Sequence, residues 1–169
     1  WKKSLLTLTT LGYAFPGAVL GLGILIPLAA FDNWLADLVL ASLRRDPGLL
    51  LTGSAGALIV AYCVRFFAIG VGAAEAGLAA ISTNIPLAAS TLGRGPKDVI
   101  LNIYQPLMRG SLASAMVLVF VDTVKELPAT LLLRPFNFDT LSTHVYGQAS
   151  LENFHGSTPA ALLIITLSL

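Results

Sequence analysis

Three charged side chains stand close together inside an apolar part of this sequence: Asp122, Lys125 and Glu126. Their spacing of i, i+3 and i+4 predicts that all three project from one side of a single helix. If a membrane-spanning helix begins near Gly110, Asp122 lies about 18 Å along it, near the middle of a hydrocarbon core about 30 Å thick. An unpaired charge at that depth costs about 2.5–3.5 kcal/mol, so the cluster must be paired or must face water.

The proline that follows this cluster supports a functional interpretation. Pro128 has no backbone N–H, and a broken membrane helix is tolerated where it is buried in protein or lines a cavity. The candidate residues of a translocation path or gate are therefore Asp122, Lys125, Glu126 and Pro128. Glu126, nearest to the proline, is the best placed of them. The alternative is structural: Lys125 neutralises Asp122 or Glu126, and the cluster holds its helix against the neighbouring ones.

The composition indicates that a bilayer is the solvent of the elements that carry these residues. Of the 169 residues, 56% are hydrophobic and 11% are charged, which is unusual for a soluble domain. The net charge is +1 and the basic residues are dispersed, so we expect no nucleic-acid partner. The single cysteine, Cys63, cannot form an internal disulfide. Because the sequence starts at Trp1 and stops at Leu169 within an apolar run, we expect a fragment of a longer protein.

Four segments approach the length of about 20 apolar residues that a helix needs to cross a bilayer. They cover residues 6–30, 49–67, 110–133 and 159–169, the last of which is truncated by the end of the sequence. We therefore expect an all-α, polytopic transmembrane helical bundle. Gly17 and Gly21 have the GxxxG spacing that lets another helix approach closely. Polar and helix-breaking positions interrupt residues 68–109, where we expect short cytoplasmic helices.

Basic residues beside the spans predict the orientation, because lysine and arginine are retained on the cytoplasmic side. With the N-terminus inside, the inner side would carry Lys2, Lys3, Arg65, Arg94, Lys97 and Arg109. The outer side would carry Arg44, Arg45 and Arg134. The larger number of basic residues on the inner side predicts that residues 68–109 lie in the cytoplasm.

A motif in this cytoplasmic stretch predicts an interaction with another protein. Five residues keep the order A-A-x3-G-x9-I-x2-P: Ala88, Ala89, Gly93, Ile103 and Pro106. The order resembles the cytoplasmic EAA loop of ABC-importer permeases, E-A-A-x3-G-x9-I-x-L-P, although Leu87 replaces the usual glutamate and Gln105 the usual leucine. The residue types predict a short helix, a sharp turn and a second short helix, ended by Pro106, able to lie in a groove of a partner. An interfacial helix resting on lipid headgroups is the alternative.

A second motif favours the permease interpretation. Residues 125–136 read KELPATLLLRPF and residues 139–141 read DTL, and this block closely resembles a signature of bacterial ferric-iron ABC transporter permeases. Residues 12–24 and 62–78 also resemble that family, so the resemblance covers nearly the whole chain. It implies that residues 1–169 form part of a type I ABC-importer permease, a multi-pass protein of the bacterial inner membrane.

The same resemblance implies the cargo and the partners. The cargo would be ferric iron, with thiamine, phosphonate or polyamine as alternatives, because permeases of similar build carry these compounds. The expected partners are a dimer of ABC ATPase subunits at the EAA-like loop, a periplasmic substrate-binding protein, a second permease half or subunit, and the lipid bilayer. The sequence has no Gly-Lys pair and hence no Walker A loop, so we expect no enzyme activity and no cofactor in this chain.

Two other classes of protein compete with this interpretation. A proton-coupled secondary transporter would use Asp122 and Glu126 as titrating groups, but it leaves the EAA-like loop without a role. A membrane scaffold or sensor without transport activity explains neither motif. His144 and His155 lack the paired spacing of metal ligands, so we expect no metal site.

Overall fold

The fold consists of helices joined by short connections. This computed structural model describes residues 2–44 and 48–169, without the side chains of residues 2–6, 8 and 43. The helices are α1 (Lys2–Ala14), α2 (Gly17–Leu43), α3 (Ala55–Ala79), α4 (Asn84–Thr91), α5 (Pro96–Val99), the π-helix η1 (Ile100–Tyr104), α6 (Gln105–Lys125), α7 (Pro128–Leu133), α8 (Leu141–Ser150) and α9 (Phe154–Leu167). No strand occurs in these residues, and the expected all-α class is confirmed.

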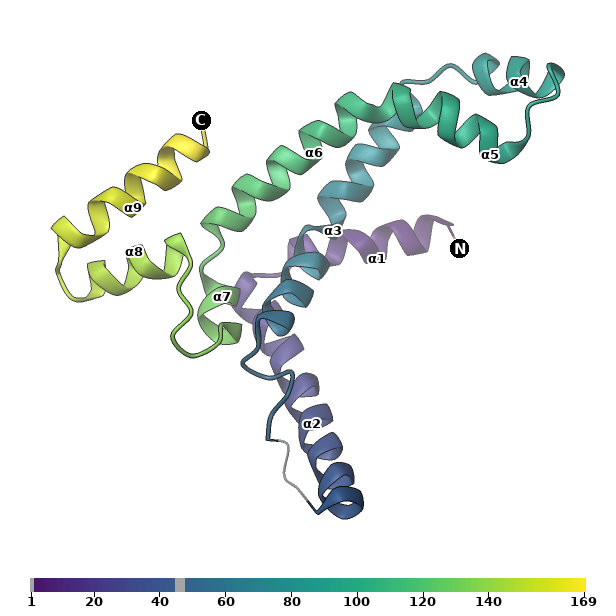
Figure 1. Ribbon diagram of the computed structural model, residues 1–169. Helices are drawn as coiled ribbons and strands as arrows, with labels where there is room; N and C mark the ends of the chain where they lie inside the picture. Colours follow the sequence, from purple (N-terminus) through teal and green to yellow (C-terminus); the bar gives the residue numbers. More distant parts are fainter. Residues whose placement is uncertain (1, 45–47) are drawn as a thin grey trace.

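Helix α3 lies at the centre, and α1, α2 and α6 all pack against it (Figure 1). Helices α3 and α6 are antiparallel: the Ser111 hydroxyl donates to the Ala73 carbonyl at 2.6 Å near one end, and Arg65 meets Glu126 near the other. The short α7 packs against α2, and α8 and α9 form a hairpin to one side (Figure 1). The α4–α5 turn projects at the far end of α6 (Figure 1).

The bounds of the first helices differ from the expected span over residues 6–30. That range is divided between α1 and α2 at Phe15 and Pro16. Proline has no N–H to donate into α1, and it disfavours the helical conformation of the residue before it. Pro27, in contrast, lies inside α2 without ending it.

The next two helices also differ from the expected spans. Helix α3 begins at Ala55 and continues to Ala79, because residues 68–79 are mostly small and apolar and contain no proline. It therefore includes the first part of the expected loop at residues 68–109. Helix α6 ends at Lys125, which divides the expected span over residues 110–133. The last expected span, residues 159–169, falls in a helix that already begins at Phe154.

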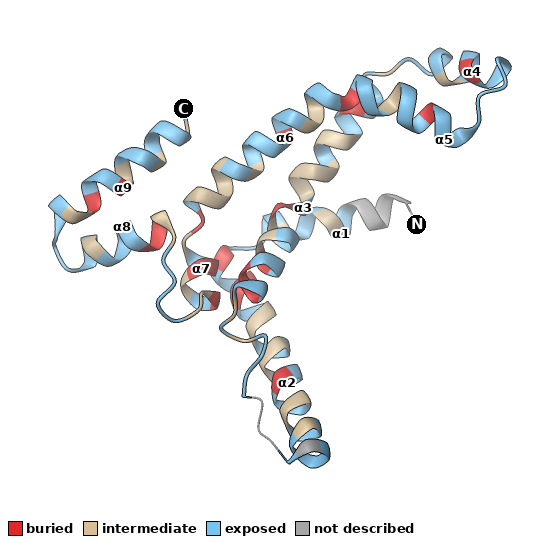
Figure 2. Cartoon of the chain, in the orientation of Figure 1, coloured by how far each residue is buried: buried red, intermediate tan, exposed pale blue. Residues whose placement is uncertain are grey.

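Within residues 2–44 and 48–169, three helices are long and apolar enough to cross a membrane: Gly17–Ser42, Ala55–Ala79 and Pro96–Lys125. Large apolar side chains on them are exposed, including Ile26 at 68% and Met116 at 72%, as suits surfaces that contact lipid. Buried residues gather where α2, α3 and α7 meet (Figure 2). The core there is formed by Leu20, Leu58, Ala61 and Leu133.

One basic residue is not where the orientation analysis placed it. Arg65 was expected beside a span on the inner side, but it lies within α3, where its side chain is 18% exposed and contacts Glu126. This expectation was wrong because an arginine can be kept inside a membrane helix when a buried carboxylate compensates it. Arg45 and the side chains of Lys2 and Lys3 lie outside the described residues, and the orientation itself stays a prediction.

Candidate functional site

The three charged residues of the sequence cluster do not share one helix face. Asp122 and Lys125 belong to the last turn of α6, whereas Glu126 lies beyond its end in an extended conformation, with φ −68° and ψ 115°. The expectation of a common face is therefore wrong. Its physical reason is Pro128, which cannot donate the backbone hydrogen bond that would continue α6 and instead occupies the first turn of α7.

Within the described residues, no ion pair joins Lys125 to Asp122 or Glu126, so the mutual pairing that the structural alternative requires does not form. The Lys125 side chain is exposed. Asp122 is half-buried and faces α1, where the Tyr13 hydroxyl lies 3.4 Å from its Oδ2. Glu126 is 6% exposed and pairs with Arg65 of α3.

The Glu126 carboxylate is held by groups from three helices. Its Oε2 lies 2.8 Å from Arg65 Nε, and its Oε1 accepts a hydrogen bond from the Ala129 N–H at 3.2 Å. Gly17, the first residue of α2, lies so close that a Cβ atom there would stand 2.5 Å from Oε1. The start of α2 adds a favourable field, because the N-terminus of a helix carries partial positive charge. Each oxygen of this buried carboxylate therefore has a polar or positively charged neighbour.

The backbone at the break is also satisfied. The Glu126 carbonyl, which is released from helical bonding where α6 ends, accepts hydrogen bonds from the hydroxyls of Thr130 and Ser142, each at 2.8 Å. The Tyr62 hydroxyl lies 2.6 Å from Thr130 Oγ1 and ties this network to α3. Threonine and serine hydroxyls therefore supply donors to a carbonyl at the helix interruption.

Arg65 completes the site from the opposite side. Its Nη1 donates a hydrogen bond to the Phe15 carbonyl at 3.0 Å, at the interruption between α1 and α2. Its Nε is close to Glu126 Oε2, but the N–H does not point at the oxygen, so this contact is an ion pair without an aligned hydrogen bond. We call the residues Phe15–Gly17, Arg65 and Glu126–Thr130 the junction. At the junction, Arg65 in the middle of α3 contacts both the interruption between α1 and α2 and the interruption between α6 and α7.

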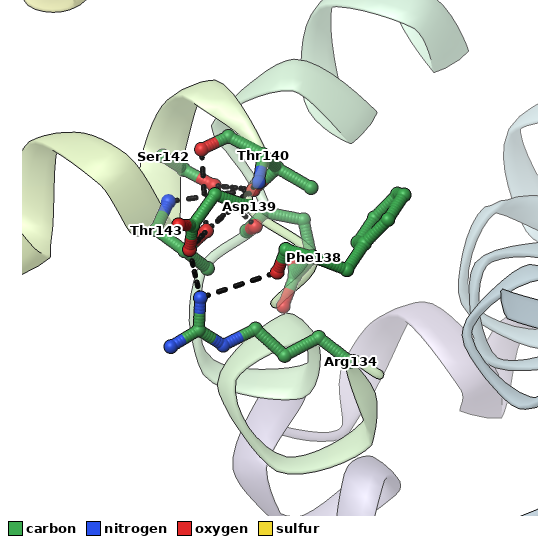
Figure 3. Close-up of polar contacts among 7 residues, drawn as sticks. Arg134, Phe138, Asp139, Thr140, Ser142 and Thr143 are labelled. Atoms are coloured by element: carbon green, nitrogen blue, oxygen red, sulfur yellow. Dashed lines mark hydrogen bonds and ion pairs between the residues drawn. The ribbon is translucent and has the colours of Figure 1, made fainter. Parts of the chain in front are cut away.

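A rigid loop leads from α7 to α8 beside the junction. Arg134 forms an ion pair with Asp139 and donates a hydrogen bond to the Phe138 carbonyl at 3.2 Å (Figure 3). Thr140 caps α8 by a reciprocal pair of hydrogen bonds with Thr143, whose hydroxyl also donates to Asp139 at 3.2 Å (Figure 3). The Thr140–Thr143 cap fixes the start of α8, and Ser142 in its first turn donates to the Glu126 carbonyl.

The EAA-like motif forms a helix, a turn and a second helix. Ala88 is exposed and Ala89 buried on α4, and Gly93 turns the chain with φ +77°, a left-handed conformation that favours glycine. The second helix is not short, and Pro106 does not end it: α5 continues through η1 into α6 without interruption. The reason is the π-helical turn around Ile103, in which Gln105 donates to the Ile100 carbonyl and the ladder widens ahead of the proline.

The motif and the junction are therefore joined by one continuous helical segment, Pro96–Lys125, which we call the rod and which bends between α5 and α6 (Figure 1). It contains 30 residues, or about 45 Å of helix measured along its bent axis. One end follows directly on the Gly93 turn, and the other ends at Glu126. The Gly93 turn and the junction are therefore connected through continuous helical backbone.

Asp32 is a buried charge that the sequence interpretation missed. It lies in α2, is 1% exposed, and accepts hydrogen bonds from the backbone N–H groups of Leu51 at 2.9 Å and Thr52 at 2.5 Å. It thereby ties the chain just before α3 to the middle of α2. The signal in the sequence was a lone aspartate directly after a long uncharged run.

We predict that Asp32→Ala lowers the stability of the α2–α3 pair. Each backbone N–H left buried without an acceptor costs about 1–3 kcal/mol. Asp32→Asn keeps one acceptor oxygen and should lose less. The thermal midpoint of the purified protein in detergent measures the effect, with Asp37→Ala as the control because this carboxylate of the same helix is exposed. Equal midpoints for Asp32→Ala and Asp37→Ala would contradict the role of Asp32.

The described residues contain no group of three His, Cys, Asp or Glu side chains close enough to hold a metal ion. His144 and His155 are both exposed. The site is instead an ion pair, a network of hydroxyl groups and a set of helix ends.

The arrangement is that of a polytopic helical membrane protein, with a broken helix stabilised by protein groups at its interruption. No protein-family model matches the chain. The chain is similar in sequence to two permeases of Haemophilus influenzae (strain Rd). It is 32% identical to the Fe(3+)-transport system permease protein FbpB 2 over 111 residues, which is 66% of the chain. It is 30% identical to the putative ferric transport system permease protein FbpB 1 over 145 residues, which is 86% of the chain.

These similarities confirm the resemblance to ferric-transport permeases that the sequence motifs indicated. The aligned part spans about a fifth of each relative's length, 22% of the first and 20% of the second. The chain thus corresponds to one segment of these larger permeases.

Proposed function

We propose that this chain is part of the membrane-spanning permease subunit of an ATP-driven importer in a bacterial inner membrane. Its cargo is ferric iron, delivered by a periplasmic binding protein, and a separate dimer of ATPase subunits supplies the energy. The names of both relatives support the cargo. A second permease half or subunit completes the path across the membrane.

The observation that carries this proposal is the rod between the Gly93 turn and Glu126. A helix–turn–helix that projects from the bundle offers a surface to a soluble partner, and the rod connects this surface with a buried ion pair at a helix break. Closure of the ATPase dimer would push the turn, and α6 would carry the displacement to the junction. Two arrangements of the junction would then correspond to inward-facing and outward-facing states.

The proposed gate consists of Glu126 and Pro128, with Lys125 directly before Glu126 and Asp122 one turn earlier on α6. Glu126 is the member that can change partners, because its carboxylate contacts α3 and α7 and lies against the start of α2. Asp122 instead faces α1, where it accepts a hydrogen bond from the Tyr13 hydroxyl at 3.4 Å. We expect Asp122 and Lys125 to line the path and not to close it.

Crosslinking tests the contact with the ATPase subunit. In the full-length permease with Cys63→Ser, Leu92→Cys places a thiol beside the Gly93 turn, at a position that is 81% exposed. We expect it to crosslink to the ATPase subunit encoded beside the permease. Leu151→Cys, 77% exposed at the turn between α8 and α9, is the control and should give no crosslink. Absence of a crosslink from Leu92→Cys, together with uptake driven by a proton gradient alone, would favour a secondary transporter.

We further predict that Gly93→Ala weakens this contact whereas Gly95→Ala does not. Alanine in the left-handed conformation of Gly93 costs about 1–2 kcal/mol, so the turn must rearrange. Gly95 lies two residues away with φ −73°, which alanine adopts readily, and a Cβ atom at either position meets open space. The Leu92→Cys crosslink yield and the uptake rate measure the difference. Equal effects of the two substitutions would contradict a specific role for the turn.

A further inference from the structure

Arg65 joins two helix interruptions that are far apart in the sequence. Its Nη1 donates to the Phe15 carbonyl at 3.0 Å, and its Nε lies 2.8 Å from Glu126 Oε2. The first acceptor belongs to the interruption between α1 and α2, and the second to the break after α6. One guanidinium on α3 therefore contacts both.

Each of the two acceptors depends on a donor from outside its own helix. The Phe15 carbonyl lies after the last residue of α1 and before the first residue of α2. A carbonyl released from a helix in a membrane must find another donor, because no water replaces the lost bond. The Glu126 carboxylate likewise needs a positive partner to remain charged while 6% exposed.

The carboxylate has little room to leave Arg65 without moving a helix. Its Oε1 is bonded to the Ala129 N–H at the start of α7, and Gly17 at the start of α2 lies directly against the same oxygen. The Arg65 Nε–H, in contrast, is buried without an aligned acceptor. The Nε–H of Arg65 is therefore free to form a hydrogen bond if the side chains shift. A second set of contacts among the same groups can then compete with the observed one.

We propose that Arg65 couples the bend at Phe15 and Pro16 to the break at Glu126, so that a displacement of α6 moves α1 and the start of α2 with it. The inference rests on the proposed function in one respect, because it takes the ATPase stroke on α6 as the source of the displacement. Arg65 is a positioning residue in this scheme: it acts on the gate through Glu126 and on α1 through a backbone carbonyl.

The chemistry of arginine suggests the decisive substitution. A guanidinium presents several donors in a planar fork and can serve two acceptors at once, whereas an ammonium is a single point of charge. Arg65→Lys keeps the charge for Glu126 but cannot hold the Phe15 carbonyl in the same geometry. We expect assembled protein that still stimulates ATP hydrolysis, with uptake per ATP reduced about tenfold.

Arg134→Lys is the matched control. Arg134 also contacts one carboxylate and one carbonyl, those of Asp139 and Phe138, but both lie in its own loop. This substitution should leave uptake per ATP unchanged. The coupling role of Arg65 is overturned if Arg65→Lys and Arg134→Lys retain the same uptake per ATP.

Gly17→Ala provides a second test that leaves Arg65 in place. The added Cβ atom, 2.5 Å from Glu126 Oε1, must push the carboxylate away from its present position. We expect the same loss of uptake per ATP. Gly23→Ala, in the same helix, meets no atom within 4 Å and serves as its control. If Arg65→Lys fails to assemble, this pair decides: equal uptake per ATP for Gly17→Ala and Gly23→Ala overturns the inference.

A distance measurement separates this inference from the proposed function. In the permease with Cys63→Ser, spin labels at Leu11→Cys of α1 and Val117→Cys of α6 occupy exposed positions. We expect a narrow distance distribution with Arg65 and a broad one with Arg65→Lys, whether or not an ATPase subunit is bound. Identical distributions overturn the coupling. Failure of any ATPase to bind contradicts only the proposed function.

Discussion

Gly12→Val is expected to prevent α1 from packing against α3. A Cβ atom on Gly12 would stand 2.2 Å from the carbonyl oxygen of Val64 and 3.1 Å from its carbonyl carbon. Both atoms belong to the backbone of α3, so they cannot move aside as a flexible side chain would. Helix α1 must separate from α3, and the Phe15 carbonyl then moves away from Arg65.

The loss of folding free energy expected from Gly12→Val exceeds the value typical of an overpacked core, about 1–3 kcal/mol. Size-exclusion chromatography and the thermal midpoint in detergent measure how much folded protein remains. Gly23→Val is the control, because Gly23 lies in α2 with open space around it. Similar yields and midpoints for the two variants would show that α1 does not need this close approach.

Glu126→Gln is expected to abolish uptake while the permease still assembles. Glutamine has nearly the same shape, and its amide oxygen can still accept the hydrogen bond that the Ala129 N–H donates. Its loss of charge leaves Arg65 without a counter-ion in a largely buried position, and breaking such a pair costs up to about 3–5 kcal/mol. The junction should then no longer adopt the conformation in which Arg65 and Glu126 are paired.

Uptake into proteoliposomes, normalised to the amount of assembled permease, measures this effect. Glu152→Gln is the control, because it makes the same chemical change at an exposed position. Normal uptake by Glu126→Gln would limit the ion pair to a structural role. Loss of both assembly and uptake would show that the ion pair is needed for folding. In that case Gly17→Ala tests the gate, because it displaces the carboxylate without removing it.

The helical class could be predicted because each apolar run is long and because local rules act within it. Pro128 predicted a break, and the break is present immediately before it. Pro16 also interrupts a helix, yet the expected first span ran through it. That span was predicted from the length of an apolar run alone, and such a criterion does not detect a proline inside the run. Gly93 was expected to turn the chain, and its left-handed backbone is present.

The partner of Glu126 could not be predicted by local reasoning. The sequence suggested Lys125, its immediate neighbour, but the end of α6 turns Glu126 away and toward α3. Arg65 was assigned to the edge of the membrane because its segment was expected to end nearby. Only the length of α3 and its antiparallel packing against α6 bring the two side chains together.

By itself, the sequence determined that the chain is helical, that much of it suits a bilayer, that Pro128 interrupts a charged helix, and that the residues around Gly93 form a helix–turn–helix. Each of these depends on interactions between residues a few positions apart, which hydrophobicity, proline and glycine control directly. The tertiary structure alone decided that Arg65, Phe15 and Glu126 meet, and that Asp32 holds the chain before α3. Buried charges and released carbonyls in lipid must find partners wherever packing places them, and that placement is a property of the whole bundle.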